Sequence, residues 1–83
     1  MITLDKLAVY RKYGGDVDAW QRAGGPSRDV ISGEEWIAIA NLLQELTMYK
    51  RNLVSKGYGD RICERLSRLT ADRATAEELM AMA

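Results

Sequence analysis

Three arginines stand at a spacing that could build a binding surface for anions. Arg61, Arg65 and Arg68 follow one another at i, i+4 and i+7, so in a helix they project from one side. Guanidinium groups bind carboxylates and phosphates, the anionic groups of acidic proteins and nucleic acids. The alternative is a solvated flank whose arginines pair with Glu64, with Asp72 or with the acidic segment that precedes them.

Side chains that could perform catalysis are scarce in this chain. It has no histidine and a single cysteine, Cys63, so neither a Cys–His nucleophile pair nor a zinc site of the common kinds is predicted. The pairs Asp16/Asp18 and Glu34/Glu35 stand at predicted helix starts, where the helix dipole favours negative charge. We therefore expect no enzyme, no cofactor, no metal and no small-molecule substrate, and we expect Cys63 to be a buried thiol.

The longest element predicted is a helix over residues 33–54. Ser32-Gly33-Glu34-Glu35 matches a capping box, which marks a helix start. At about 100° per residue, the apolar positions of this helix cover roughly half of its circumference. A helix apolar over so wide an arc needs more than one neighbour, so it should be the centre of the fold. The arc contains Trp36, Ile39, Ala40, Leu42, Leu43, Leu46, Thr47, Tyr49, Leu53 and Val54.

Two apolar residues of this helix fall outside the main arc. Ile37 and Met48 are separated by about three turns, so they stack on the same side of the helix. Either the short helices cover them, or they contribute to a contiguous apolar patch, which is typical of an interface. The second interpretation predicts a partner-binding surface in which Ile37 and Met48 are the apolar part. Arg61, Arg65 and Arg68 would then supply charge complementarity.

Two helices are predicted before the central one. Thr3 is a suitable N-cap for a helix that ends near Tyr13 and is stopped by a glycine pair. Asp16 can cap a second, short helix over residues 17–23. Residues 24–31, which contain two glycines and the single proline, are expected to form a loop.

Two further helices are predicted after the central one. The first spans about residues 57–70, and either Ser55 or Asp60 could be its cap. Thr75-Ala76-Glu77-Glu78 matches a second capping box and is expected to open a short C-terminal helix.

Charge and composition restrict the partners and the compartment. Twelve basic and twelve acidic residues give a net charge of zero, which argues against a strong general attraction to nucleic acid or to anionic membranes. Residues 29–49 nevertheless carry no basic side chain, whereas residues 50–73 carry seven basic and three acidic ones. The single cysteine and the absence of a signal-peptide pattern or membrane-length apolar run predict a cytoplasmic protein.

Together these patterns predict an all-α fold. We expect one domain over residues 1–83, built as a small bundle of four to five helices around the long helix at about 33–54. The expected function is a non-catalytic protein–protein interaction module of the adaptor, immunity or regulator-binding kind. Its partner would be another protein or a second copy of the chain. The alternative is a nucleic-acid-binding regulator that uses the basic helix 57–70.

Overall fold

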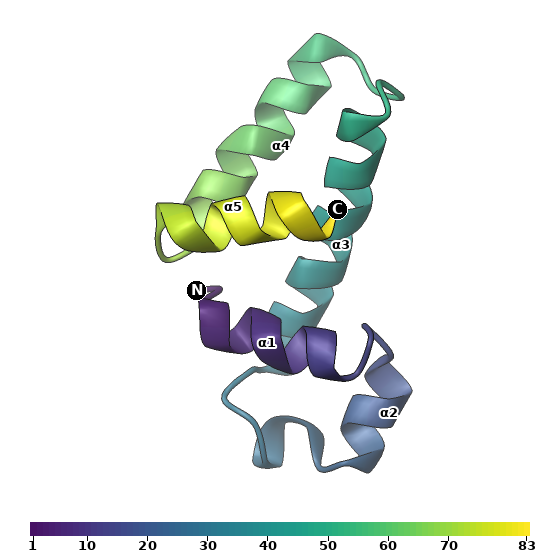
Figure 1. Ribbon diagram of the computed structural model, residues 1–83, viewed down its shortest axis with the longest axis vertical. Helices are drawn as coiled ribbons and strands as arrows, with labels where there is room; N and C mark the ends of the chain where they lie inside the picture. Colours follow the sequence, from purple (N-terminus) through teal and green to yellow (C-terminus); the bar gives the residue numbers. More distant parts are fainter.

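The computed structural model describes all residues from Met1 to Ala83. It consists of α-helices joined by short connections and one 3₁₀ turn, with no strand, which confirms the all-α fold. The elements are α1 (Leu4–Lys12), α2 (Val17–Arg22), η1 (Gly25–Ser27), α3 (Gly33–Lys50), α4 (Lys56–Leu69) and α5 (Arg73–Met82) (Figure 1).

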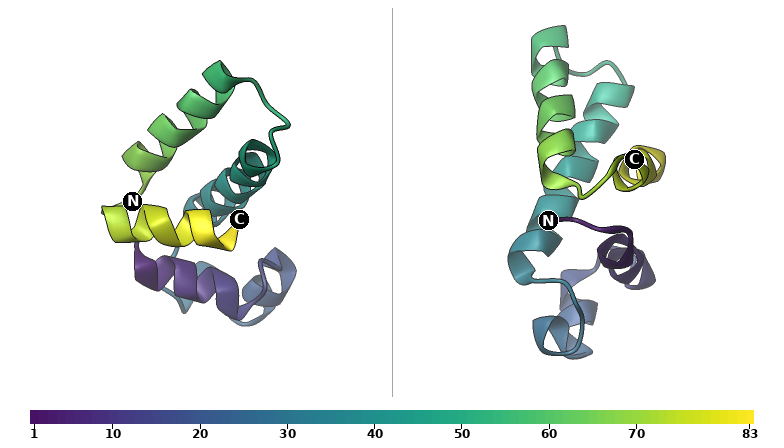
Figure 2. Two further views of the ribbon diagram at one scale, coloured as in Figure 1. Left: turned by 45° about the horizontal axis from the view of Figure 1, so that its top comes forward. Right: turned by 90° about the vertical axis from the view of Figure 1, so that its left-hand side faces the viewer.

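Helix α3 is the central element of the fold, as predicted. It contacts α1, α4 and α5 along its length. Both α1 and α5 cross α3 on one side, and α4 returns beside α3 from the far end (Figure 1, Figure 2). Helix α2 and the η1 turn lie at the opposite end, beside the start of α3. This arrangement covers α3 on two sides and leaves a third side without a neighbouring helix.

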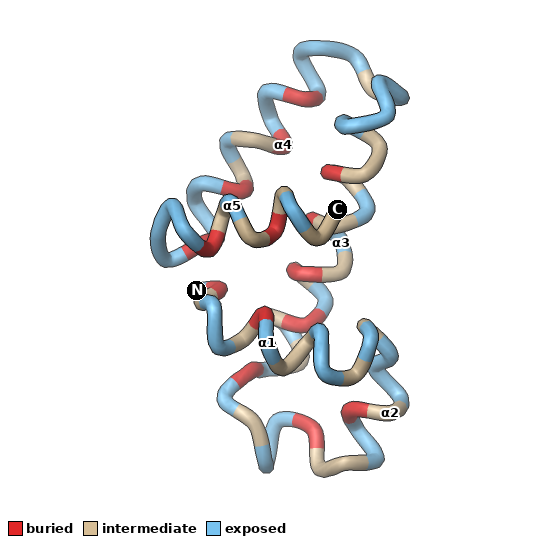
Figure 3. The backbone as a smooth tube through the Cα atoms, in the orientation of Figure 1, coloured by how far each residue is buried: buried red, intermediate tan, exposed pale blue.

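A single hydrophobic core forms where these helices meet α3. Eleven buried apolar residues make up one cluster. Figure 3 shows the buried positions on the inward sides of α1, α3, α4 and α5. The apolar arc expected on α3 was too wide, because Leu43, Ala40 and Thr47 are only half-buried. The core residues are Ile2, Leu7, Trp20, Ile31, Trp36, Ile39, Leu42, Leu46, Ile62, Leu66 and Leu79.

The start of α3 is fixed by the predicted capping box. The Ser32 hydroxyl accepts a hydrogen bond from the Glu35 amide at 3.1 Å, and the Glu35 carboxylate accepts one from the Ser32 amide at 3.0 Å. Ile31 and Trp36 flank this box and are both buried. They occupy the two positions of a hydrophobic staple, which sets the angle at which the chain enters a helix.

Helix α3 ends at Lys50, so the expectation that it continues to Val54 was wrong. Asn52 adopts a left-handed conformation with φ of 55°, a conformation that asparagine tolerates better than most residues. The Leu53 amide then donates to the Met48 carbonyl at 2.9 Å, and the Asn52 amide donates to the Tyr49 carbonyl at 3.1 Å. This pair of bonds is a Schellman motif, which closes the helix and turns the chain toward α4.

The N-caps of α4 and α5 decide between the two predicted caps of α4 and correct the predicted start of α5. Ser55 caps α4, because its hydroxyl accepts a hydrogen bond from the Tyr58 amide at 3.3 Å. Helix α5 begins at Arg73, not after Thr75, because the Asp72 carboxylate accepts from the Thr75 amide at 2.8 Å. Thr75 is fully buried and donates its hydroxyl to the same carboxylate at 2.7 Å, so it is an internal residue of the helix.

The beginning of the chain is held by a contact that the sequence does not predict. The Ile2 amide donates to the Leu69 carbonyl at 2.8 Å, and the Ala71 amide donates to the Ile2 carbonyl at 2.8 Å. Ile2 is therefore a one-residue β-bridge partner of Thr70 and contributes its side chain to the core. This contact attaches the start of the chain to the connection between α4 and α5.

Candidate protein-interaction surface

One side of α3 has no helix packed against it. Four residues repeat there at i, i+4, i+7 and i+11, and we call them the outer stripe: Ile37, Asn41, Gln44 and Met48. Ile37 is 60% exposed, whereas Met48 is half-buried. The stripe is about 16 Å long at 1.5 Å per residue. It has an apolar residue at each end and uncharged amides between them.

Small residues border the outer stripe along one side, and charged residues flank it at its two ends. Ala40 and Thr47, which border it on the side toward α1 and α5, are small and half-buried. Charged side chains occur at its ends, with Glu34 in the first turn of α3 and Arg51 at the C-cap. Between these ends, the four residues of the outer stripe carry no charge over three turns of the helix. Removing water from this face therefore requires no ion to be desolvated.

Arg65, the middle arginine of the predicted stripe, binds α3. Its Nη1 donates to both oxygens of Glu45 at 2.8 and 2.7 Å. The Glu45 side chain is only 19% exposed, so this ion pair is partly sheltered from solvent. The acidic segment that the sequence offered as an alternative partner is therefore the partner of this arginine. Arg65 holds α4 against α3 instead of projecting freely from the surface.

Arg61 and Arg68 lie beyond Arg65 on the exposed side of α4. Both are exposed, and neither forms an ion pair or a side-chain hydrogen bond. On α3, Glu45 lies between the buried side and the outer stripe, so the Glu45–Arg65 pair marks the seam between the two exposed helix faces. Of the five residues predicted as a site, only Arg65 is shown to bind the other helix, through Glu45. The five are Ile37 and Met48 on α3, Arg65 at the seam, and Arg61 and Arg68 beyond it.

Leu53 is an exposed apolar residue directly after α3, and its exposure was missed by the sequence analysis. It is 64% exposed, although the predicted arc placed it inside the fold. In a Schellman motif the residue at this position commonly contacts the residue whose carbonyl it binds, which here is Met48. The signal in the sequence was Asn52, a residue type that often ends helices in the left-handed conformation.

Comparison with family models, curated proteins and solved structures finds no match to this chain. No helix has both the length and the apolar character required to cross a membrane.

A groove lies on the other side of α3 from the outer stripe. It lies between the ends of α1 and α5 and has a volume of about 520 Å³. Its arginine is already bound by the Glu78 carboxylate at 2.7 Å, and burial raises the pKa of its tyrosine. The lining residues are Tyr10, Arg11, Gly14, Gly15, Leu43 and Met82.

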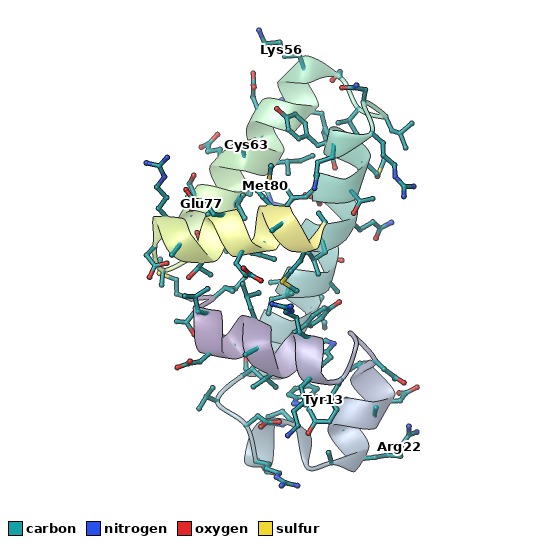
Figure 4. The ribbon with its side chains drawn as sticks, in the orientation of Figure 1. Tyr13, Arg22, Lys56, Cys63, Glu77 and Met80 are labelled. Carbon is teal, nitrogen blue, oxygen red and sulfur yellow. The ribbon has the colours of Figure 1, made fainter.

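Aromatic packing fixes the end of α3 that begins the outer stripe. Trp36 stacks on Trp20 of α2 with ring centroids 4.5 Å apart and contacts Tyr10 of α1 at 4.7 Å. Tyr13, labelled in Figure 4 at the end of α1, lies 6.5 Å from the same indole. Cys63, labelled in Figure 4 on α4, is half-buried, whereas the sequence predicted a buried thiol. Helices α1 and α2 therefore both hold the first turns of α3, from which Ile37 projects.

The Glu35 carboxylate adds an electrostatic contribution to the stability of the fold at the same end of α3. Partial burial raises the pKa of this carboxyl, but hydrogen bonds from Lys6 and Ser32 outweigh that effect and lower its pKa to about 2. The charged carboxylate thus binds α1 through Lys6 and caps α3 through Ser32. Because the folded state favours the ionised form, this stabilisation is complete above the unfolded pKa and is lost as the pH falls.

We expect the stability of the chain to decrease between pH 4.5 and about 2, where Glu35 takes up its proton. Urea unfolding followed by circular dichroism across this range would measure the decrease. In Glu35→Gln, which has no charge to lose, the pH dependence should be clearly flatter. Glu64→Gln, which changes an exposed carboxyl without a side-chain hydrogen bond, should retain the wild-type slope. Identical slopes for wild type and Glu35→Gln would contradict the assignment.

Proposed function

We propose that this chain is a non-catalytic interaction module that binds a protein through the outer stripe of α3. The observation that carries the proposal is the combination of a 60% exposed isoleucine with an uncharged helix face three turns long. Interface centres are depleted of charged residues in the same way. Burying an isoleucine side chain fully is worth about 1.5–3 kcal/mol, most of which Ile37 has not gained within the monomer.

The arginines beyond the seam suit the rim of such an interface. Arg61 and Arg68 are exposed and free of ion pairs, so they can approach acidic groups of a partner. Rim charges mainly accelerate and orient association, whereas buried apolar contacts slow dissociation. We therefore assign Ile37 and Met48 to affinity and Arg61 and Arg68 to orientation. With only one cysteine, the chain needs no oxidising compartment, and we propose the cytoplasm as its location.

A nucleic-acid partner has less support from the same surface. Of the three arginines in the stripe, Arg65 is engaged by Glu45, and Glu64 lies between the two that remain free. Two guanidinium groups give few phosphate contacts, and the net charge of zero supplies no general attraction to a polyanion. Binding of a nucleic-acid duplex by wild type at low salt, lost in Arg61→Glu, would favour the nucleic-acid-binding regulator instead.

Affinity capture with matched variants tests the proposal. Wild type, Ile37→Asp and Val17→Asp would be immobilised and exposed to extract from the source cells, with recovered proteins quantified by mass spectrometry. Val17 is an exposed aliphatic residue in the first turn of α2, where an aspartate suits the helix dipole. We expect a protein, or the chain itself, to be recovered with wild type and Val17→Asp and at least tenfold less with Ile37→Asp.

The folded state of each variant must be checked by circular dichroism. Ile37→Asp should keep the wild-type spectrum because this side chain contributes little to the core. Met48→Asp should cost more stability than Ile37→Asp, since Met48 is half-buried. Equal recovery with wild type and Ile37→Asp would reject the outer stripe as the binding surface. Unfolding of Ile37→Asp would instead place Ile37 in the core and would also reject it.

A further inference from the structure

We propose that the outer stripe binds a second copy of this chain, with the two α3 helices packed antiparallel about a two-fold axis. The inference rests on the proposed function, because it names the partner of the same surface. A two-fold interface requires a patch complementary to itself, so that residue i contacts residue j and residue j contacts residue i. The outer stripe meets this requirement, and so do Glu34 and Arg51, the charged residues that flank it.

The apolar and amide positions are symmetric about the middle of the stripe. Asn41 and Gln44 stand on either side of the midpoint, and Ile37 and Met48 are equally distant from it. When two such helices pack antiparallel, Ile37 of one copy lies opposite Met48 of the other, twice per dimer. Asn41 and Gln44 then surround the axis, where their amide groups can donate and accept hydrogen bonds across the interface.

The charged residues that flank the stripe favour the antiparallel orientation over the parallel one. Glu34 and Arg51 are also equally distant from the midpoint, one at each end. Antiparallel packing brings Glu34 of one copy level with Arg51 of the other at both ends. Parallel packing would instead place Glu34 beside Glu34 and Arg51 beside Arg51. The small flanking residues Ala40 and Thr47 allow the two helix axes to approach to the usual 8–10 Å.

The size of the stripe predicts a reversible dimer. We expect one helix face about 16 Å long to bury less area than the 1,200–2,000 Å² of a standard stable interface. We therefore expect a dissociation constant in the micromolar range, where the chain exists as a mixture of monomer and dimer.

Sedimentation velocity of the full chain over a range of concentrations tests the dimer. Wild type and Val17→Asp should shift from monomer to dimer as concentration rises, and Ile37→Asp should weaken association at least tenfold. Charge reversal then tests the orientation. Glu34→Arg alone and Arg51→Glu alone should each weaken association, because each places like charges level at both ends.

A mixture of the two single charge variants gives the sharpest result. Combining Glu34→Arg protein with Arg51→Glu protein should restore association as a heterodimer, because every facing pair is then of opposite sign. The double variant Glu34→Arg/Arg51→Glu should also dimerise by itself. Circular dichroism of each variant confirms that it is folded, since both single changes oppose the helix dipole of α3.

The possible outcomes separate this inference from the proposed function. A wild-type chain that remains monomeric up to ~1 mM, well above the expected micromolar range, overturns self-association. The proposed function survives that result if Ile37→Asp still abolishes capture of a different protein. If Ile37→Asp leaves dimer association unchanged, the placement of the dimer interface on the outer stripe is overturned. Failure of the mixture to associate better than either single variant overturns the antiparallel arrangement.

Discussion

Replacement of Trp20 by alanine is expected to lower the free energy of unfolding by about 3–5 kcal/mol. Trp20 is 1% exposed, stacks on Trp36 and donates its indole N–H to the Asp29 carboxylate at 3.1 Å. Helix α2 has only six residues and cannot be stable by itself, so this side chain is its anchor to α3. Loss of the indole removes the stack, the hydrogen bond and the attachment of α2 together.

Urea unfolding monitored by far-UV circular dichroism measures this effect. A loss of that size is a large fraction of the 5–15 kcal/mol that stabilises a typical domain, so part of the population should be unfolded without urea. Trp20→Phe is the control, because it keeps an aromatic ring against Trp36 while removing the donor to Asp29. Its loss should be clearly smaller. A loss below about 1 kcal/mol for Trp20→Ala would show that α2 does not depend on this anchor.

Leu46→Ala should cost about 2–5 kcal/mol, whereas Leu43→Ala should cost distinctly less. Both leucines belong to the apolar arc of α3, and the sequence predicts a deep position for both. In the structure Leu46 is completely buried, but Leu43 is half-buried and lines the groove between α1 and α5. Truncation of Leu46 leaves a closed cavity. Truncation of Leu43 enlarges a groove that water already enters, so no empty space is created.

The comparison of these two variants uses the same helix and the same chemical change. Thermal and urea unfolding of each would give the two losses under identical conditions. Because the positions are three residues apart on α3, helix propensity changes equally in both and cancels in the difference. Equal losses would mean that the groove closes in solution and that Leu43 is a core residue.

Local signals explain most of what the sequence predicts about the fold. The capping box at Ser32 and the N-caps Thr3 and Asp16 depend on residues a few positions apart, and all three form as expected. Two signals were missed because local patterns competed. Asn52 ends α3 although apolar residues continue beyond it, and Asp72 caps α5 although Thr75 also begins a capping-box pattern. The burial of Thr75 decides the second case, and burial depends on the whole fold.

The candidate site shows the same division between local and distant causes. The helical spacing of Ile37 and Met48 was sufficient to place them on one face. The engagement of Arg65 by Glu45 depends on how α4 is aligned along α3, which the chain reversal after Lys50 determines. The β-bridge of Ile2 with Thr70 joins residues at opposite ends of the chain. No pattern within a single segment could reveal that contact.

The stacked indoles of Trp20 and Trp36 also give this protein a built-in optical reporter. They are the only tryptophans in the chain, and their rings lie 4.5 Å apart and nearly parallel, so their electronic transitions should couple. The far end of the α3–α4 hairpin carries two tyrosines, Tyr49 and Tyr58, whereas both indoles lie at the opposite end of α3. Fluorescence excited at the red edge therefore follows only the half of the molecule around α2. Disagreement between that signal and the amide circular dichroism during melting would reveal that the two halves unfold separately.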